Sequence, residues 1–131
     1  HLSLTDSGWV SETIEMGGAL DGYVGTFPDI LVDNSGVLHV IYADGKNGLL
    51  KHAFRAADTW SIETIDTIGT QGAEGVMTGA LAAEIDSLGR IGVAYWDSDD
   101  GLLKYAMVPE PATLLLLAGG LGVVRLARRR R

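Results

Sequence analysis

The residues best suited to chemistry lie in one acidic loop late in the chain. Asp97-Ser-Asp-Asp-Gly101 supplies three carboxylates and a glycine turn, which together provide the oxygen ligands that Ca²⁺ prefers. The twelve-residue calcium loop and its bidentate glutamate are absent, and the related segment Asp44-Gly-Lys-Asn-Gly48 holds one carboxylate and a lysine. We therefore expect a solvated hairpin turn here and no metal or other cofactor, with Ca²⁺ as the alternative.

An aromatic residue stands beside this loop. Trp96 follows a tyrosine where the related segment has Ala43, so its ring could project at the rim of a sheet next to Asp97 and Asp99. Sugar-binding sites use exposed aromatic rings in this way, although single exposed aromatics are also common. These three residues are the candidate ligand-binding set of the sequence.

The histidines do not form a site in the sequence. His1 and His52 occupy equivalent positions of a repeat described below, and Tyr105 takes that position in the next copy, which indicates packing rather than ligation. His39 corresponds to Gly92, so the repeat does not require it. It either lines a channel or, as a single imidazole without partners, is a satisfied and partly buried side chain.

No catalytic arrangement can be recognised. Residues 1–107 contain only Arg55 and Arg90, both next to predicted turns, so there is no cluster of arginines to bind a carboxylate substrate. No serine lies in a Gly-x-Ser-x-Gly elbow. We expect the chain not to be an enzyme, and a glycan-active hydrolase or lyase remains the alternative if upstream residues supply the site.

An internal repeat organises these residues. Residues 33–53 align without gaps on residues 86–106, with ten of 21 positions identical, and residues 1–15 align on 52–66. The spacings are 53 and 51 residues, so one unit is close to 52 residues long. Such a period indicates a repeated supersecondary unit.

Each unit is predicted to hold four short strands. Turn residues bound apolar runs rich in β-branched side chains, and the run over 37–42 is apolar on both faces, as expected of a buried strand. The last strand of a unit has polar alternation and should be outermost and half solvated. The predicted strands are Ile30–Asp33, Val37–Tyr42, Leu49–Phe54, Trp60–Ile65, Leu81–Asp86, Ile91–Trp96 and Leu102–Ala106.

Four antiparallel strands in about 50 residues, repeated, are typical of a β-propeller blade. The units resemble the sialidase-type propeller blades of exported bacterial proteins through recurring Asp-x-x-Gly, Tyr-x-Asp and Trp-x-x-Glu-Thr-Ile patterns, although the Asp-box is incomplete around Asp6, Gly8 and Trp9. We therefore expect an all-β partial propeller in which Trp9 and Trp60 pack between blades. A solenoid of stacked sheets is the alternative.

The strands add up to one outer strand, one full blade and three strands of another, which is too little for a closed ring. Because the chain starts at His1 without a signal peptide, we expect an N-terminally truncated fragment. The fourth strand missing from the last blade could be lent by the N-terminus of the full-length protein.

Charge separates the chain into two parts. Residues 1–107 carry sixteen acidic and five basic side chains, a net charge of −11, and disfavour nucleic acid as a partner. The tail has five arginines against Glu110. The chain has no cysteine, so it contains neither disulfides nor thiolate metal sites.

The tail has the order of a sorting signal. Val108-Pro-Glu-Pro111 precedes an apolar stretch over 112–124, followed by Arg125 and by Arg128, Arg129, Arg130 and Arg131. A membrane span needs about 20 apolar residues, and snorkelling of Arg125 makes this stretch a minimal transmembrane helix. The arginine cluster then lies in the cytoplasm and residues 1–107 outside it. A buried C-terminal helix would not explain four terminal arginines.

These residues resemble the PEP-CTERM sorting domain, also called the ice-binding protein C-terminal domain. Pro109, Glu110 and Pro111 match its signature, residues 113–124 its hydrophobic helix, and the last four arginines its basic end. The resemblance implies export in a Gram-negative bacterium, recognition by an exosortase-type membrane protease, and release or attachment at the cell surface, often with exopolysaccharide.

Taken together, the residues predict a β-propeller-like region over 1–107 and a sorting tail over 108–131. The expected protein is a membrane-inserted, then surface-exposed binding scaffold for glycan or protein. A decayed gene remnant that keeps only the function of its tail is a further alternative.

Overall fold

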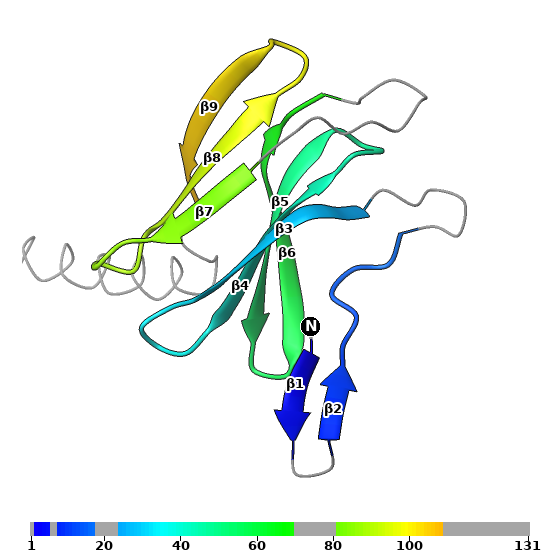
Figure 1. The fold of residues 1–131 in the computed structure, drawn as a ribbon, viewed down its shortest axis with the longest axis vertical. Coiled ribbons are helices and arrows are strands. Elements are labelled where there is room, and N and C mark those ends of the chain that lie inside the picture. The colour runs from blue at the N-terminus through cyan, green and yellow to red at the C-terminus, as the bar shows by residue number, and fades with distance from the viewer. Residues whose placement is uncertain (1, 6–7, 18–23, 70–80, 109–131) are drawn as a thin grey trace, which may run out of the picture.

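Nine antiparallel strands in three sheets make up the described part of the chain (Figure 1). The computed structural model describes residues 2–5, 8–17, 24–69 and 81–108. This confirms the predicted all-β class for these residues. The strands are β1 (Leu2–Thr5), β2 (Gly8–Ser11), β3 (Val24–Val32), β4 (Leu38–Asp44), β5 (Leu49–Ala56), β6 (Thr59–Thr67), β7 (Leu81–Ile85), β8 (Ile91–Asp97) and β9 (Leu102–Met107).

The first sheet has the strand order β3-β4-β5-β6. Strand β4 is buried along almost its whole length, as its apolar run predicts, and β6 is the half-exposed outer strand that its polar alternation predicts. The predicted bounds were too short. β3 starts at Val24, six residues before the prediction, because irregularities in its register with β4 carry the strand past Pro28.

The second sheet, β7-β8-β9, repeats the pairing of β3-β4-β5 with a shift of 53 residues, except at the start of β7, where the pair Leu81–Tyr95 has no counterpart because the register of β3 is irregular. Ile41 lies opposite His52 in the first sheet, and Ala94 lies opposite Tyr105 in the second. The same holds for the first turn of each sheet, where the Asp33 and Asp86 carboxylates accept two backbone N–H groups each. Gly36 and Gly89 close these turns at φ 82° and 80°, a conformation that glycine adopts without strain.

The N-terminal hairpin differs from its prediction. Two strands, β1 and β2, lie where one outer strand was expected, and their pairing is that of β5 with β6 shifted by 51 residues. The expected packing of Trp9 between blades is wrong for these residues, since its side chain is 72% exposed. Its counterpart Trp60 is half-buried against the first sheet.

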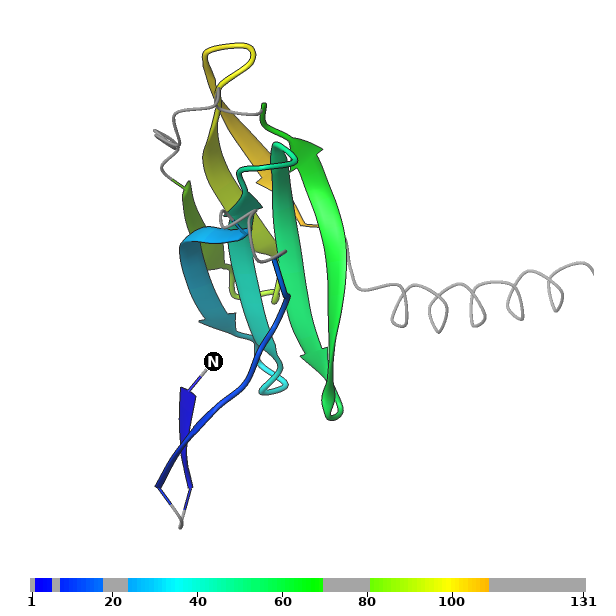
Figure 2. The same ribbon diagram turned by 90° about the vertical axis from the view of Figure 1, so that its right-hand side faces the viewer.

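Each larger sheet has two faces, which we name from the first sheet. The forward face carries His39, Ile41, Ala43, Leu50 and His52, and the rear face carries Val40, Tyr42, Asp44, Lys51 and Ala53. The forward face of the first sheet packs on the rear face of the second, where Ile91, Val93 and Tyr95 are buried (Figure 2). This sheet-to-sheet contact is the main hydrophobic core.

The described residues form neither a closed barrel nor a closed propeller. Among them no helix is long and apolar enough to cross a membrane. The predicted transmembrane helix and the sorting signature fall on residues 109–131, which lie outside the described residues.

Candidate functional site

The three candidate ligand-binding residues do not converge. Trp96 and Asp97 are neighbours on β8, so their side chains leave opposite faces of the second sheet. Trp96 is partly exposed on the forward face, whereas the Asp97 side chain is buried on the rear face. Asp99 lies exposed in the following turn. The structure therefore does not assemble these residues into one binding site.

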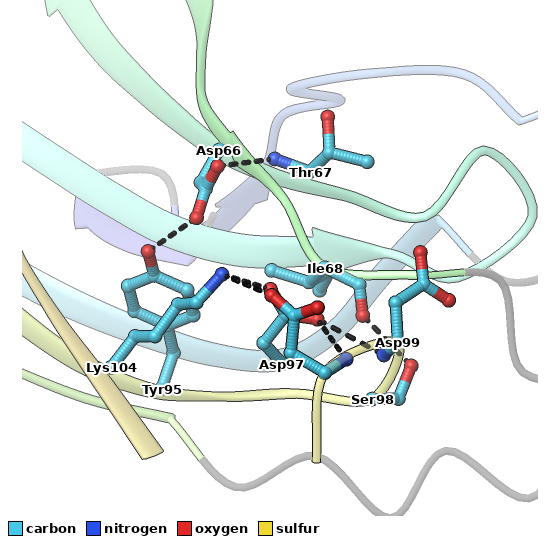
Figure 3. Close-up of polar contacts among 9 residues, drawn as sticks. Asp66, Thr67, Ile68, Tyr95, Asp97, Ser98, Asp99 and Lys104 are labelled. Atoms are coloured by element: carbon cyan, nitrogen blue, oxygen red, sulfur yellow. Dashed lines mark hydrogen bonds and ion pairs between the residues drawn. The ribbon is translucent and has the colours of Figure 1, made fainter. Parts of the chain in front are cut away.

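The Asp97 carboxylate stabilises the turn that follows it. Its Oδ1 accepts the backbone N–H groups of Asp99 and Asp100, and its Oδ2 accepts a hydrogen bond from Lys104 Nζ (Figure 3). The Lys104 ammonium holds the pKa of Asp97 below its usual value. Both carboxylate oxygens of Asp97 are engaged, and the Lys104 ammonium lies where a bound cation would contact them. The loop is therefore a turn stabilised by its first residue, Asp97.

No group of three or more metal-ligating side chains is found among the described residues. The two arginines considered for catalysis both have carboxylate partners. Arg55 lies 3.4 Å from Glu12, and Arg90 Nε lies 2.7 Å from Asp86 in the turn. Neither arginine approaches the other or a candidate nucleophile through a described contact.

A tyrosine hydroxyl joins the two sheets. Tyr95, on the rear face of the second sheet, donates a hydrogen bond of 2.5 Å to the Asp66 carboxylate at the end of β6 (Figure 3). Burial and this hydrogen bond raise the pKa of Tyr95 to about 12. The backbone N–H and hydroxyl of Ser98 donate to the Ile68 carbonyl close by. Polar contacts thus fix how the second sheet sits on the first.

The same arrangement recurs on the first sheet. The Tyr42 hydroxyl donates to Glu15 at 2.6 Å, and Lys51 Nζ bridges Glu15 at 2.7 Å and Asp44 at 2.9 Å. Burial opposes the charge of Lys51, but the two carboxylates raise its pKa above the ordinary value. The cluster thus ties Glu15, in the segment after β2, to the rear face of the first sheet.

A chain of buried polar side chains crosses the forward face of the first sheet. His39 Nδ1 lies 2.9 Å from His52 Nε2, and the two rings stack with their centroids 5.1 Å apart. His39 Nε2 is 3.2 Å from the Asp33 carboxylate, and His52 Nδ1 is 2.8 Å from Glu63. His39 is a satisfied side chain, as predicted, but it is fully rather than partly buried, and its contact with His52 differs from the lone imidazole that the sequence suggested.

Sequence reasoning missed this network because it treated the histidines one at a time. The signal was present in the turn between β4 and β5. Pairing Asp44 with Leu49 across this turn fixes the register and puts Ile41 opposite His52. His39 lies two residues before Ile41 on the same face, so it is the diagonal neighbour of His52.

We expect acid to weaken the fold through His52. Burial lowers the pKa of His52 below 6.5, Glu63 opposes this shift, and His39 adds to it. The unfolded chain therefore takes up a proton at His52 at a higher pH than the folded chain. Stability is complete above about pH 6.5 and falls below it by up to about 1.4 kcal/mol per pH unit.

Thermal unfolding between pH 7.5 and 5 measures this effect. The variant His52→Gln should have a lower melting temperature at pH 7.5 but a flatter decline with acidification. An identical decline in the two proteins would show that other groups cause the acid sensitivity.

The comparisons with known proteins identify the end of the chain. First, the described residues are an all-β array of antiparallel sheets, and no group of three metal-ligating side chains is found among them. Second, residues 108–131 match the family model described as the PEP-CTERM protein-sorting motif. This motif is recognised by exosortase, a membrane protease, and implies sorting to the cell surface. Neither curated proteins nor solved structures gave a match to the chain.

Proposed function

We propose that residues 1–107 are the displayed, non-catalytic part of a surface protein and that residues 108–131 deliver it there. The observation that carries this proposal is the position of the sorting motif. Strand β9 ends at Met107, and the motif starts with the next residue, Val108. A folded sheet is therefore joined without a spacer to the segment that exosortase recognises.

Several features support a binding scaffold. The carboxylates that could serve a catalyst, Asp33, Asp44 and Asp97, are engaged with turn amides and neighbouring cations. The Tyr95–Asp66 contact links the two larger sheets, and the Tyr42–Glu15 contact holds the segment after β2 on the first sheet, which favours a rigid framework. We propose that the units are blades of a propeller-type domain, supported by the 53- and 51-residue shifts in strand pairing.

The tail supplies the topology in this proposal. Its apolar stretch inserts into the membrane with the arginine cluster in the cytoplasm, so that the sheets lie on the opposite side. Exosortase then acts at the Pro-Glu-Pro signature. The displayed scaffold binds glycan or protein partners at the surface.

We expect deletion of Pro109–Arg131 to move the tagged protein from the membrane fraction to the soluble fraction in a Gram-negative host with an exosortase. The matched variant replaces Pro109, Glu110 and Pro111 by alanine and keeps the apolar stretch. It should remain in the membrane as an unprocessed precursor, because insertion requires the apolar stretch and recognition requires the signature.

Fractionation, followed by immunoblotting for a tag outside the tail, separates these results. Unchanged fractionation after the deletion would exclude the sorting role. Normal processing of the alanine variant would exclude recognition of the signature.

A further inference from the structure

We propose that the forward face of the second sheet binds a neutral glycan, with one pyranose ring seated against Tyr105. This inference places a site for the glycan partner of the scaffold proposed above, and it rests on that function. The rear face of the second sheet packs on the first sheet, so the forward face points away from the core. It bears a groove of about 400 Å³, a size typical of ligand sites.

The floor of the groove is made of small residues. Ala82 and Ala94 are cross-strand partners on β7 and β8, and Gly92 lies on the same face two residues before Ala94. In the first sheet, the positions equivalent to Ala94 and Gly92 hold Ile41 and His39, which are buried. The second sheet is therefore hollow where the first sheet is filled by large side chains.

The groove also carries charge at a position where the first sheet has an apolar residue. Glu84 on β7 occupies the position of Leu31, which packs against the sheet-to-sheet core. Arg90 lines the groove as well. Its side chain is 61% exposed, and its Nε lies 2.7 Å from Asp86. A further sheet docked here would bury the Glu84 carboxylate and leave the hollow unfilled, and both effects cost free energy.

Tyr105 provides an aromatic surface along the groove. Its hydroxyl donates a hydrogen bond of 2.8 Å to Met107 Sδ, and the end of its ring lies over Gly92, where any side chain would collide with it. Tyr105 is paired with Ala94, so Gly92 is only its diagonal neighbour and the ring must lean across β8. The side chain is still 67% exposed, which leaves ring surface open to a ligand.

These groups match the chemistry of a sugar ring. The C–H bonds on one face of a pyranose can meet the negative face of an aromatic ring, while its hydroxyl groups donate to a carboxylate and accept from a guanidinium. The lining has Glu84 and Asp86 against Arg90, so it disfavours acidic sugars. Trp96, the aromatic candidate from the sequence, lies on the same face but not among the residues that line the groove.

Isothermal titration calorimetry of the purified full chain, in a detergent without a sugar headgroup, tests the site. The probes are neutral tetrasaccharides of β-linked glucose, mannose, galactose and N-acetylglucosamine. We expect at least one of them to bind. The tetramer of galacturonic acid should bind more weakly than that probe, because the carboxylates of the groove repel it. Tighter binding of the acidic tetramer would contradict the assignment to a neutral glycan.

Three variants locate the binding. Tyr105→Ala removes the ring surface and should weaken binding at least about tenfold. Ala94→Ile introduces the residue that the first sheet carries at the equivalent position, and it should abolish binding because its side chain fills the hollow. Leu103→Ala is the matched control, since Leu103 is 76% exposed on the same face but does not line the groove. Its affinity should equal that of the unaltered chain.

Failure of every neutral probe to bind the unaltered chain would overturn the proposal and favour a protein partner for this face. An equal loss of affinity in Leu103→Ala and Tyr105→Ala would also overturn it, because binding would then not depend on the groove. The titration uses purified protein and requires no exosortase. A negative result is therefore distinct from a failure of the sorting function, which fractionation measures.

Discussion

Replacing Lys51 by methionine is expected to lower the free energy of unfolding by about 3 kcal/mol. The ammonium lies between Asp44, whose side chain is 1% exposed, and Glu15. Methionine keeps the apolar stem but leaves the Asp44 carboxylate buried without its cation. The loss of a partner costs more than the pair itself contributes, because the remaining charge cannot regain its hydration.

Urea unfolding of the variant measures the loss. Lys46→Met, at an exposed position of the neighbouring turn, is the matched control and should change stability by less than about 0.5 kcal/mol. Adding Asp44→Asn to Lys51→Met should restore part of the stability, because it removes the unpaired charge. A Lys51→Met protein as stable as the unaltered chain would mean that Asp44 is not held by this contact.

Much of the fold follows from the sequence because the repeat is read directly from aligned residues. The apolar run over 37–42 predicts a strand buried on both faces, and β4 is one. Strand ends were harder to predict, since the irregular start of β3 depends on how the chain passes Pro28 while keeping contact with β4. Trp9 was placed in a core because it aligns with Trp60, but its hairpin has no larger sheet to pack against.

The candidate site was less predictable. Composition draws attention to Asp97 and Asp99 as ligands, but it does not reveal that Lys104 and the turn amides engage Asp97. The His39–His52 contact depends on the register between β4 and β5, which single-residue arguments do not use. The Tyr95–Asp66 contact depends on the packing of two sheets, and the Tyr42–Glu15 contact depends on how the segment after β2 lies on the first sheet. Glu15 and Asp66 align in the sequence, but their common role is visible only with Tyr42 and Tyr95 in place.

Shortening Ile41 to alanine is expected to destabilise both larger sheets together by about 3 kcal/mol. Its side chain is fully buried on the forward face of the first sheet, in the cluster that contains Val93 and Tyr95 of the second. The cavity removes contacts from both sheets, so a single core predicts one cooperative transition that moves to lower denaturant.

Hydrogen exchange of amides in β5 and β8 separates a shared core from two independent sheets. Both sets should lose protection by the same free energy in Ile41→Ala, while Leu88→Ala, at an exposed turn residue, should leave them unchanged. If β8 kept its protection while β5 lost it, the second sheet would be stable without the first. The interface between the two sheets would then contribute little to stability.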